Sequence, residues 1–263
     1  MRNRPRRQKI VSGRHIFAVL IAVFAIIGGY AGYRLIMTEV DYTAAQEEYA
    51  RLRHYAPGGN ASSSNPIDPA ESEDSTVSDS INEANEQAPD LTNINPDYVG
   101  WIRINGTEID YPVVQGTDNT KYLTTTFTGE NNPSGTIFMD SACTNGFDFF
   151  TILHGHNMRD GSMFAGLHRF TDNRFRADFS EIIVYSPTRG ILTYKIFAVK
   201  LTNIYDEVFN LPTQGIAERG RYFADFGFSE EDLRDNLDIM VLATCTLGER
   251  NERLLVFSAR VTN

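Results

Sequence analysis

An apolar run without charged side chains, Ile16–Tyr33, constrains the fold of this chain more than any other feature. Its 18 residues reach the lower limit for a helix that crosses a bilayer core of about 30 Å. Basic residues concentrate before the run, and such residues stay in the cytoplasm. The pattern predicts a cytoplasmic basic segment over 1–15, a single-pass plasma-membrane anchor over 16–33 and an extracellular location for the rest. The bases are Arg2, Arg4, Arg6, Arg7, Lys9 and Arg14 before the run and Arg34 after it.

A cleaved secretory signal is the alternative, because a basic start followed by an apolar stretch is typical of both. The run is longer than the roughly 7 to 15 apolar residues of a signal peptide. No clear small-x-small cleavage site follows it. Both observations favour an anchor that stays attached.

The distribution of charge narrows the possible partners. The formal net charge is −10, but residues 1–38 contain seven bases and no acid. The remaining 225 residues therefore hold 17 bases and 34 acids, a net charge of −17. Binding to nucleic acid requires basic surface that neutralises phosphates, so this acidic ectodomain argues against nucleic acid. The 41% of hydrophobic residues excludes a wholly disordered chain.

Residues 34–92 connect the anchor to the globular part, and their composition indicates a helix followed by a tether. Glu39–Tyr55 carries apolar residues at three- and four-residue spacing, which predicts a juxtamembrane helix. Residues 57–97 contain nine acids and no base, and such a segment buries too little apolar surface to fold. We therefore predict an acidic, flexible tether. The alternative that part of it forms a helix packed on the domain stays open.

From Asp97 onward, short apolar runs alternate with turn residues. Asn105-Gly106 favours a tight hairpin, because both residues tolerate a positive φ. No regular alternation of strands and helices appears. We therefore predict that residues 93–263 form a mainly β domain, an antiparallel barrel or sandwich with peripheral helices. Helices are expected at Ser162–Phe170 and at Ser229–Leu237, which opens with a capping-box pattern. The expected strands are Tyr98–Ile104, Thr107–Val114, Gly135–Met139, Phe149–His154, Ile182–Ser186, Ile191–Thr202, Ile239–Thr244 and Arg253–Val261.

Two cysteines are the candidate nucleophiles of the extracellular part. A thiol with a histidine elsewhere in the chain is typical of a thiolate nucleophile and its proton partner. Cys245 ends a strongly apolar run, where a side chain emerges from a rigid strand, whereas Cys143 lies in a predicted loop. Two other interpretations stay open here: Cys245 as a buried small hydrophobe, and a disulfide between the two cysteines in an oxidising compartment.

His154 and His156 follow an apolar strand with a spacing that places both on one face. Two histidines so placed are compatible with a metal site. A third ligand is not evident near them, so we expect no metal, and the less specific interpretation is a pair of turn-capping histidines.

Six local motifs together resemble the sortases, specifically class B, over about residues 93–261. The resemblance implies a closed eight-stranded, antiparallel or mixed β-barrel with peripheral helices, preceded by the transmembrane helix. It also implies display on a Gram-positive cell surface. The motifs are Gly100-Trp101-Ile102, Asp110-Tyr111-Pro112-Val113-Val114-Gln115-Gly116, Gly135-Thr136-Ile137-Phe138-Met139-Asp140, Gly155-His156-Asn157-Met158 with Gly161-Ser162-Met163-Phe164, Leu242-Ala243-Thr244-Cys245, and Arg253-Leu254-Leu255-Val256.

The resemblance carries the family's catalytic cysteine onto Cys245, its histidine onto His156 and its arginine onto Arg253. Two positions depart from the family pattern without removing a catalytic group. Val241 replaces a threonine of the cysteine motif, and His154 occupies a position where an aromatic residue is common. The same resemblance suggests substrate contacts at Asn119, at Leu123 and around Ala243. No cofactor is implied.

The implied activity is a cysteine transpeptidase that cleaves a sorting signal after its Thr and forms a thioacyl enzyme. The acyl group then passes to an amine of a peptidoglycan precursor, so the implied partners are sorting-signal-bearing surface proteins and that precursor. Two other functions stay open. One is a cysteine endopeptidase in which water takes the acyl group, and the other is a non-catalytic, membrane-tethered binding domain.

Overall fold

The computed structural model describes residues 13–57, 91–144, 146–234, 237–246 and 248–261. It divides the chain into two units between Thr43 and Ala44. The second unit contains every residue to which the sequence assigned chemistry. Most of the predicted tether, residues 58–90, lies outside the described residues.

A single helix, α1 (Gly13–Arg53), covers both the predicted anchor and the predicted juxtamembrane helix. In the first unit, Phe24 and Ile26 are 72% and 71% exposed. The helix is long and apolar enough to cross a membrane by length and composition. The predicted helices at both segments are therefore confirmed, and they are continuous.

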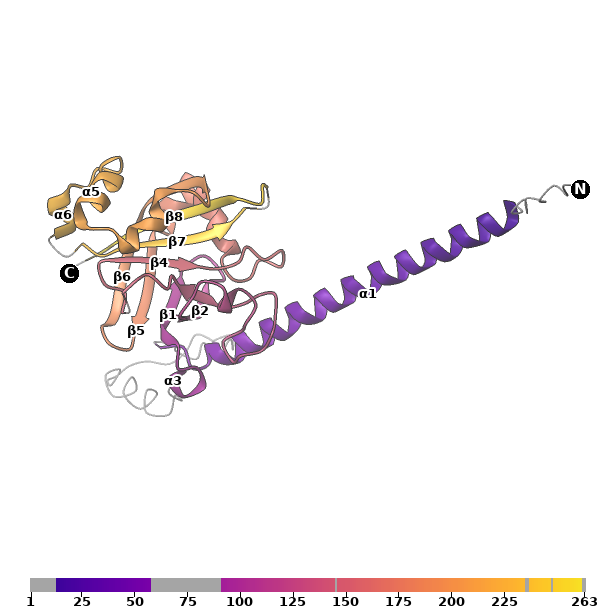
Figure 1. The fold of residues 1–263 in the computed structure, drawn as a ribbon. Coiled ribbons are helices and arrows are strands. Elements are labelled where there is room, and N and C mark those ends of the chain that lie inside the picture. The colour runs from indigo at the N-terminus through magenta and orange to yellow at the C-terminus, as the bar shows by residue number, and fades with distance from the viewer. Residues whose placement is uncertain (1–12, 58–90, 145, 235–236, 247, 262–263) are drawn as a thin grey trace, which may run out of the picture. The chain divides into compact units, whose positions relative to one another are not determined.

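Eight strands close into one barrel in the order β1-β2-β3-β4-β7-β8-β6-β5. Two neighbouring pairs, β2–β3 and β4–β7, are parallel, and the other pairs are antiparallel. The predicted closed, mixed barrel is confirmed (Figure 1). The strands are β1 (Tyr98–Ile104), β2 (Asp110–Val114), β3 (Ile137–Met139), β4 (Phe150–His154), β5 (Glu181–Ser186), β6 (Gly190–Asn203), β7 (Ile239–Cys245) and β8 (Glu252–Arg260).

Strands β7 and β8 are buried on both faces. Six consecutive residues of β7 and five of β8 are buried, whereas a strand with one solvated face alternates between buried and exposed residues. The inward side chains fill the barrel. An outward residue such as Phe257 packs against Phe223 and Phe226, with ring centroids 6.1 and 5.0 Å apart. The connection that follows β6 therefore covers the outside of β8.

The turn between β1 and β2 contains the predicted Asn105-Gly106. Gly106 has a φ of 79°, which a glycine adopts at little cost. The backbone N–H of Ile104 donates to the carbonyl of Ile109 at 2.9 Å. The hairpin is confirmed, but β2 begins at Asp110 and not at Thr107, because the Thr107 hydroxyl donates to the Ile104 carbonyl at 2.8 Å and holds a longer turn.

Helices surround the barrel as predicted, with different boundaries. The first expected helix is the 3-10 helix η2 (Ala165–Thr171), and the second is α6 (Glu230–Arg234). Ser229 caps α6: its hydroxyl accepts from Asp232 N–H at 3.2 Å, and Asp232 accepts from Ser229 N–H at 2.6 Å. A short helix, α3 (Leu91–Ile94), lies at the end of the segment predicted as a tether, and its Leu91 is buried, as in the alternative of a helix packed on the domain. The helices that the sequence did not predict are η1 (Lys121–Leu123), α4 (Asn173–Asp178), η3 (Glu207–Thr213) and α5 (Ile216–Ala224).

The last turns of α1 belong to the core of the second unit. Ala45, Tyr49 and Leu52 are each at most 4% exposed. The hydroxyl of Tyr49 donates to the carbonyl of Gly135 at 2.5 Å, and Glu48 accepts from the backbone N–H of Thr128 at 2.9 Å. This segment of α1 therefore contributes both apolar contacts and hydrogen bonds to the fold.

Removal of this segment of α1 tests how much it stabilises the domain. The sequence predicts that the domain begins at residue 93, after this segment. We expect fragments 44–263 and 91–263 both to fold and to cleave peptide, since neither lacks a proposed catalytic group. Burial of Tyr49 and Leu52 contributes about 1.5–3 kcal/mol each, so the shorter fragment should lose about 3–6 kcal/mol in its free energy of unfolding. Urea unfolding followed by tryptophan fluorescence measures this difference. Equal stabilities would show that the segment contributes nothing.

Candidate active site

The strand register brings the three predicted catalytic residues to one end of the barrel, called here the site end. The parallel pair β4–β7 aligns His154 with Ala243, and His156 follows two residues later. The antiparallel pair β7–β8 aligns Cys245 with Arg253. Adjacent strands lie about 4.8 Å apart, so segments far apart in the sequence become neighbours.

Gly155 joins the histidine segment closely to the cysteine strand. Its N–H donates to the carbonyl of Ala243 at 3.2 Å, and the hydroxyl of Thr244 donates to its carbonyl at 2.8 Å. A Cβ atom at this position would lie 2.5 Å from Ile137 Cδ1 and 2.7 Å from the Phe164 ring. Any larger residue here would have to displace the side chains of Ile137 and Phe164, so glycine allows the backbone next to His156 to approach β7 closely.

His156 is partly exposed, and its Nε2 lies 2.8 Å from the carbonyl oxygen of Leu123. A carbonyl only accepts, so Nε2 carries the proton in this arrangement. Among the described residues, Nδ1 of His156 has no hydrogen-bond partner. The ring therefore retains one nitrogen that can take or give a proton at the site end.

His154 has different surroundings. Its Nε2 lies 3.0 Å from Oδ2 of Asp140, and its ring stacks on Phe138 and Phe209 at 5.1 and 6.2 Å. Burial of Asp140 opposes its charged form, but hydrogen bonds from His154 and from a backbone N–H outweigh burial and lower the pKa of this carboxyl. The two histidines thus bind different partners.

Among the residues that the structure describes, no group of three His, Cys, Asp or Glu side chains could hold a metal ion.

The two cysteines are both free, so the disulfide alternative is wrong. Cys143 is 7% exposed, and its Sγ accepts from the backbone N–H of Ile152 at 3.3 Å. Burial raises the pKa of the Cys143 thiol to about 12, which keeps it protonated and unreactive at neutral pH. Cys245 is partly exposed at the end of β7, so the interpretation of Cys245 as a fully buried hydrophobe is also wrong.

Arg253 faces Cys245 with a positive charge that no carboxylate pairs among the described residues. Its Nη1 donates to the carbonyls of Glu252 and Arg250 at 2.8 and 3.3 Å. These bonds fix the position of the guanidinium and leave other N–H donors available. Such a group is suited to stabilise a developing oxyanion.

The three predicted substrate contacts differ in accessibility. Leu123 is 38% exposed and stands beside His156 through its carbonyl. Asn119 is an exposed residue whose side-chain amide donates to Asp140 at 2.9 Å and accepts from Ser141 N–H at 2.8 Å. Ala243 is 3% exposed. Leu123 and Asn119 are therefore both accessible to a ligand, whereas the Ala243 side chain is buried.

His168 is a residue of the site that the sequence did not reveal. It lies on η2, and its Nε2 is 3.1 Å from the carbonyl oxygen of Cys245 and 3.1 Å from the amide nitrogen of Asn157. A protonated Nε2 donates to the backbone carbonyl of Cys245, and an unprotonated Nε2 accepts from the Asn157 amide, so either tautomer ties η2 to one of these two segments. No motif in the sequence marks this position, because the contact depends on how η2 folds back onto β7.

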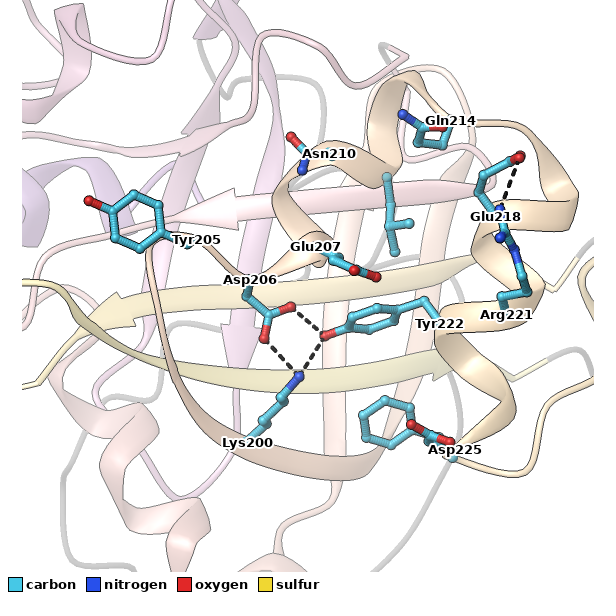
Figure 2. Close-up of a pocket in the computed structure, with 12 residues that line it drawn as sticks. Lys200, Tyr205, Asp206, Glu207, Asn210, Gln214, Glu218, Arg221, Tyr222 and Asp225 are labelled. Atoms are coloured by element: carbon cyan, nitrogen blue, oxygen red, sulfur yellow. Dashed lines mark hydrogen bonds and ion pairs between the residues drawn. The ribbon is translucent and has the colours of Figure 1, made fainter.

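A cavity of about 870 Å³ lies between β6, η3 and α5, and none of the predicted catalytic residues lines it. Figure 2 shows Lys200, Asp206 and Tyr222 meeting on one side of it, where Asp206 binds Lys200 at 2.7 Å and accepts from Tyr222 at 2.8 Å. Asp206 also accepts from Thr202 at 2.7 Å. This network ties η3 and α5 to the end of β6.

Comparison with known proteins identifies the class to which this fold and site belong. Residues 102–261 match the family described as Sortase domain. The match covers more than half of the chain. The chain therefore belongs to the sortase family.

The similar proteins are sortases of class B. Sortase B of Listeria monocytogenes is 42% identical over 120 residues, 44% of this chain and 48% of the relative. Sortase B of Staphylococcus aureus is 35% identical over 121 residues, 46% of this chain and 49% of the relative. The alignments thus span about half the length of these curated relatives. A structure of a mutant form of Clostridium perfringens sortase B matches with a TM-score of 0.67 and 29% identity, covering 82% of this chain and 98% of that one.

Proposed function

We propose that this chain is a membrane-anchored cysteine transpeptidase with Cys245 as nucleophile, His156 as proton carrier and Arg253 as oxyanion partner. The observation that supports it most is the register that aligns Cys245 with Arg253 and brings the histidine segment beside them. The burial of Cys143 leaves Cys245 as the accessible thiol among the two cysteines.

The first half-reaction forms a thioacyl enzyme. A cysteine of ordinary pKa, about 8.5, is only a few per cent thiolate at neutral pH, so the fraction that reacts depends on its surroundings. The Cys245 thiol gives its proton to Nδ1 of His156, the thiolate adds to the carbonyl carbon of the Thr in a sorting signal, and Arg253 donates to the oxyanion. The peptide C–N bond then breaks, and His156 gives its proton to the leaving amine.

The second half-reaction transfers the acyl group. An amine of a peptidoglycan precursor adds to the thioester carbon, the C–S bond breaks, and a new amide joins the surface protein to the precursor. His156 accepts the proton that the amine loses. The thiolate of Cys245 is regenerated, so the cycle needs no cofactor.

The apolar part of α1 supports attachment to the plasma membrane, with residues 1–15 in the cytoplasm and the catalytic domain outside. This orientation rests on the excess of basic residues before the apolar run. With this orientation, the catalytic domain lies in the compartment that contains surface proteins and cell-wall precursors.

Incubation of the full chain in detergent with a Thr-containing sorting peptide and an amine tests this function. Mass spectrometry should detect a thioacyl adduct on Cys245 and, with amine present, an amide product. Release of the free acid alone, at every amine concentration, would show a hydrolase instead. Absence of both adduct and cleavage would favour a binding domain.

Replacement of Arg253 by lysine tests the oxyanion role. Lysine keeps the charge but loses the fork of N–H donors, so cleavage should slow by roughly 10² to 10³, comparable with the loss of one oxyanion donor. Adduct formation should remain detectable at long times by mass spectrometry. Arg174→Gln, at an exposed position on α4, serves as the control. An Arg253→Lys rate equal to that of the unchanged protein would contradict the role.

A further inference from the structure

A second cavity, of about 400 Å³, lies between the last turns of α1 and the site end of the barrel. This volume is within the range of small-molecule sites. We call it the α1 cavity. Its walls are contributed by α1, by the β1–β2 turn, by β2, by the residues before β3 and by the loop after His156. The lining residues are Ala45, Gln46, Tyr49, Ala50, Arg53, Glu108, Tyr111, Ser134, Asp160, Gly161, Ser162 and Met163.

Hydrogen-bonding groups of the α1 cavity are left unused by the protein. Ser134 is 1% exposed, and its Oγ has no hydrogen-bond partner in the described part of the chain. A buried hydroxyl without a partner is costly, and native proteins rarely keep one without a reason. Tyr111 is 2% exposed and accepts from Met163 N–H at 3.1 Å, while its own proton has no acceptor among the described residues.

Arg53 adds a charge to these donors. Its Nε donates to the carbonyl of Asp110 at 3.2 Å, and its guanidinium carbon lies 5.2 Å from the centre of the Tyr111 ring. No carboxylate within the described residues forms an ion pair with it. Ser134, Tyr111 and Arg53 therefore offer N–H and O–H groups that suit a carboxylate or a peptide carbonyl.

Carboxylates stand at the exposed side of the same cavity. Glu108 is exposed and makes no side-chain hydrogen bond with a described residue. Asp160 is also exposed and accepts from Gln46 and from Ser162, at 2.9 and 2.7 Å. The carboxylate of a ligand could accept from Ser134, Tyr111 and Arg53 inside the cavity. Its N–H groups could donate to Glu108 and Asp160 at the exposed side.

The α1 cavity adjoins the catalytic histidine. Gly135 follows Ser134 and has a φ of 57°; a Cβ there would collide with the carbonyl oxygens of Tyr122 and Leu123. The Leu123 carbonyl in turn binds His156. On the other wall, the backbone carbonyl of His156 accepts from Phe164 N–H at 2.9 Å. The backbone segments that border the cavity are therefore the same segments that contact His156.

We propose that the α1 cavity binds the amine substrate, a short peptide that carries a free amine and a carboxylate. This inference rests on the proposed transpeptidase function. The carboxylate and carbonyl groups of the peptide bind Ser134, Tyr111 and Arg53, and its amine extends toward the thioacyl group on Cys245. The last turns of α1 thus form part of the acceptor site as well as part of the core.

Kinetics with the full chain in detergent test the proposal, with triglycine and triglycine amide as probes. Ser134→Ala and Arg53→Gln should each raise the KM for triglycine roughly three- to tenfold, the effect expected from one lost hydrogen bond. Triglycine amide lacks the carboxylate, so Arg53→Gln should affect it less. Arg174→Gln is the control outside the cavity, and its KM should equal that of the unchanged protein. An unchanged KM for triglycine in both cavity variants overturns the proposal.

Three further measurements separate this inference from other causes. Cleavage of the sorting peptide without amine reports the first half-reaction, and its absence in the unchanged protein would contradict the proposed function. The thermal unfolding temperature of Ser134→Ala should not fall, because the lost hydroxyl had no partner. A higher KM in this variant is therefore not due to unfolding.

NMR titration of triglycine into Cys245→Ala measures binding without turnover. Addition of Ser134→Ala to that protein should weaken binding by the same factor, and equal affinities overturn the proposal.

Discussion

Replacement of Cys245 by alanine in the full chain is expected to abolish cleavage of a sorting peptide completely. Without Sγ no thioester forms, so neither hydrolysis nor transfer to an amine can follow. Intact-protein mass spectrometry after incubation with the peptide should show the unmodified mass only. The circular dichroism spectrum should be unchanged, since cysteine and alanine are both small and the position is partly exposed.

Cys143→Ala provides the matched control. Burial raises the pKa of this thiol to about 12, so it takes no part in the reaction, and the variant should keep its adduct and its turnover. The loss of a buried sulfur that accepts from Ile152 lowers stability slightly. An adduct on Cys143, or cleavage by Cys245→Ala, would contradict the assignment of the nucleophile.

Replacement of His156 by alanine is expected to slow turnover by roughly 10² to 10⁴, the usual contribution of a general acid and base. The variant loses the group that we propose to protonate the leaving amine and to accept the proton of the incoming one. Cleavage followed by chromatography at neutral pH measures the loss.

The comparison with His154→Ala makes this result specific. His154 is held by Asp140 and stacks on Phe138 and Phe209, so its removal should lower stability while most of the activity remains. Equal losses in the two variants would contradict the assignment of His156. Restoration of activity by zinc after treatment with a chelator would instead support a metal site formed by both histidines.

Most of the barrel could be predicted from local sequence. Runs of β-branched and aromatic residues bounded by turn residues predicted eight strands, and Asn105-Gly106 predicted the hairpin between β1 and β2. Helices such as η3 and α5 were missed, because short helices on a barrel surface are stabilised by packing that local propensity does not encode. Phe223 of α5, for example, is buried against Phe257 of β8, and no local pattern indicates that contact.

The candidate site could be predicted only in part. Cys245, His156 and Arg253 stand in recognisable motifs, but spacing along the chain does not reveal that they meet. The parallel pairing of β4 with β7 places the histidine segment beside the cysteine strand, and the antiparallel pairing of β7 with β8 places Arg253 opposite Cys245. His168 and Tyr49 carry no motif at all. Their importance depends on hydrogen bonds to Cys245 and Gly135, which exist only in the folded chain.

The pairing of β4 with β7 also determines when the enzyme becomes competent. It joins Phe150 to Ile239 and His154 to Ala243, and contacts between such distant residues form slowly because a long loop must close first. A chain synthesised from its N-terminus has its histidine long before its cysteine strand. The thiol therefore gains the histidine segment as a neighbour only when β7 pairs with β4. Activity should appear as a single late event during refolding, with the same time course as burial of β7, so that an incompletely folded molecule has no working nucleophile.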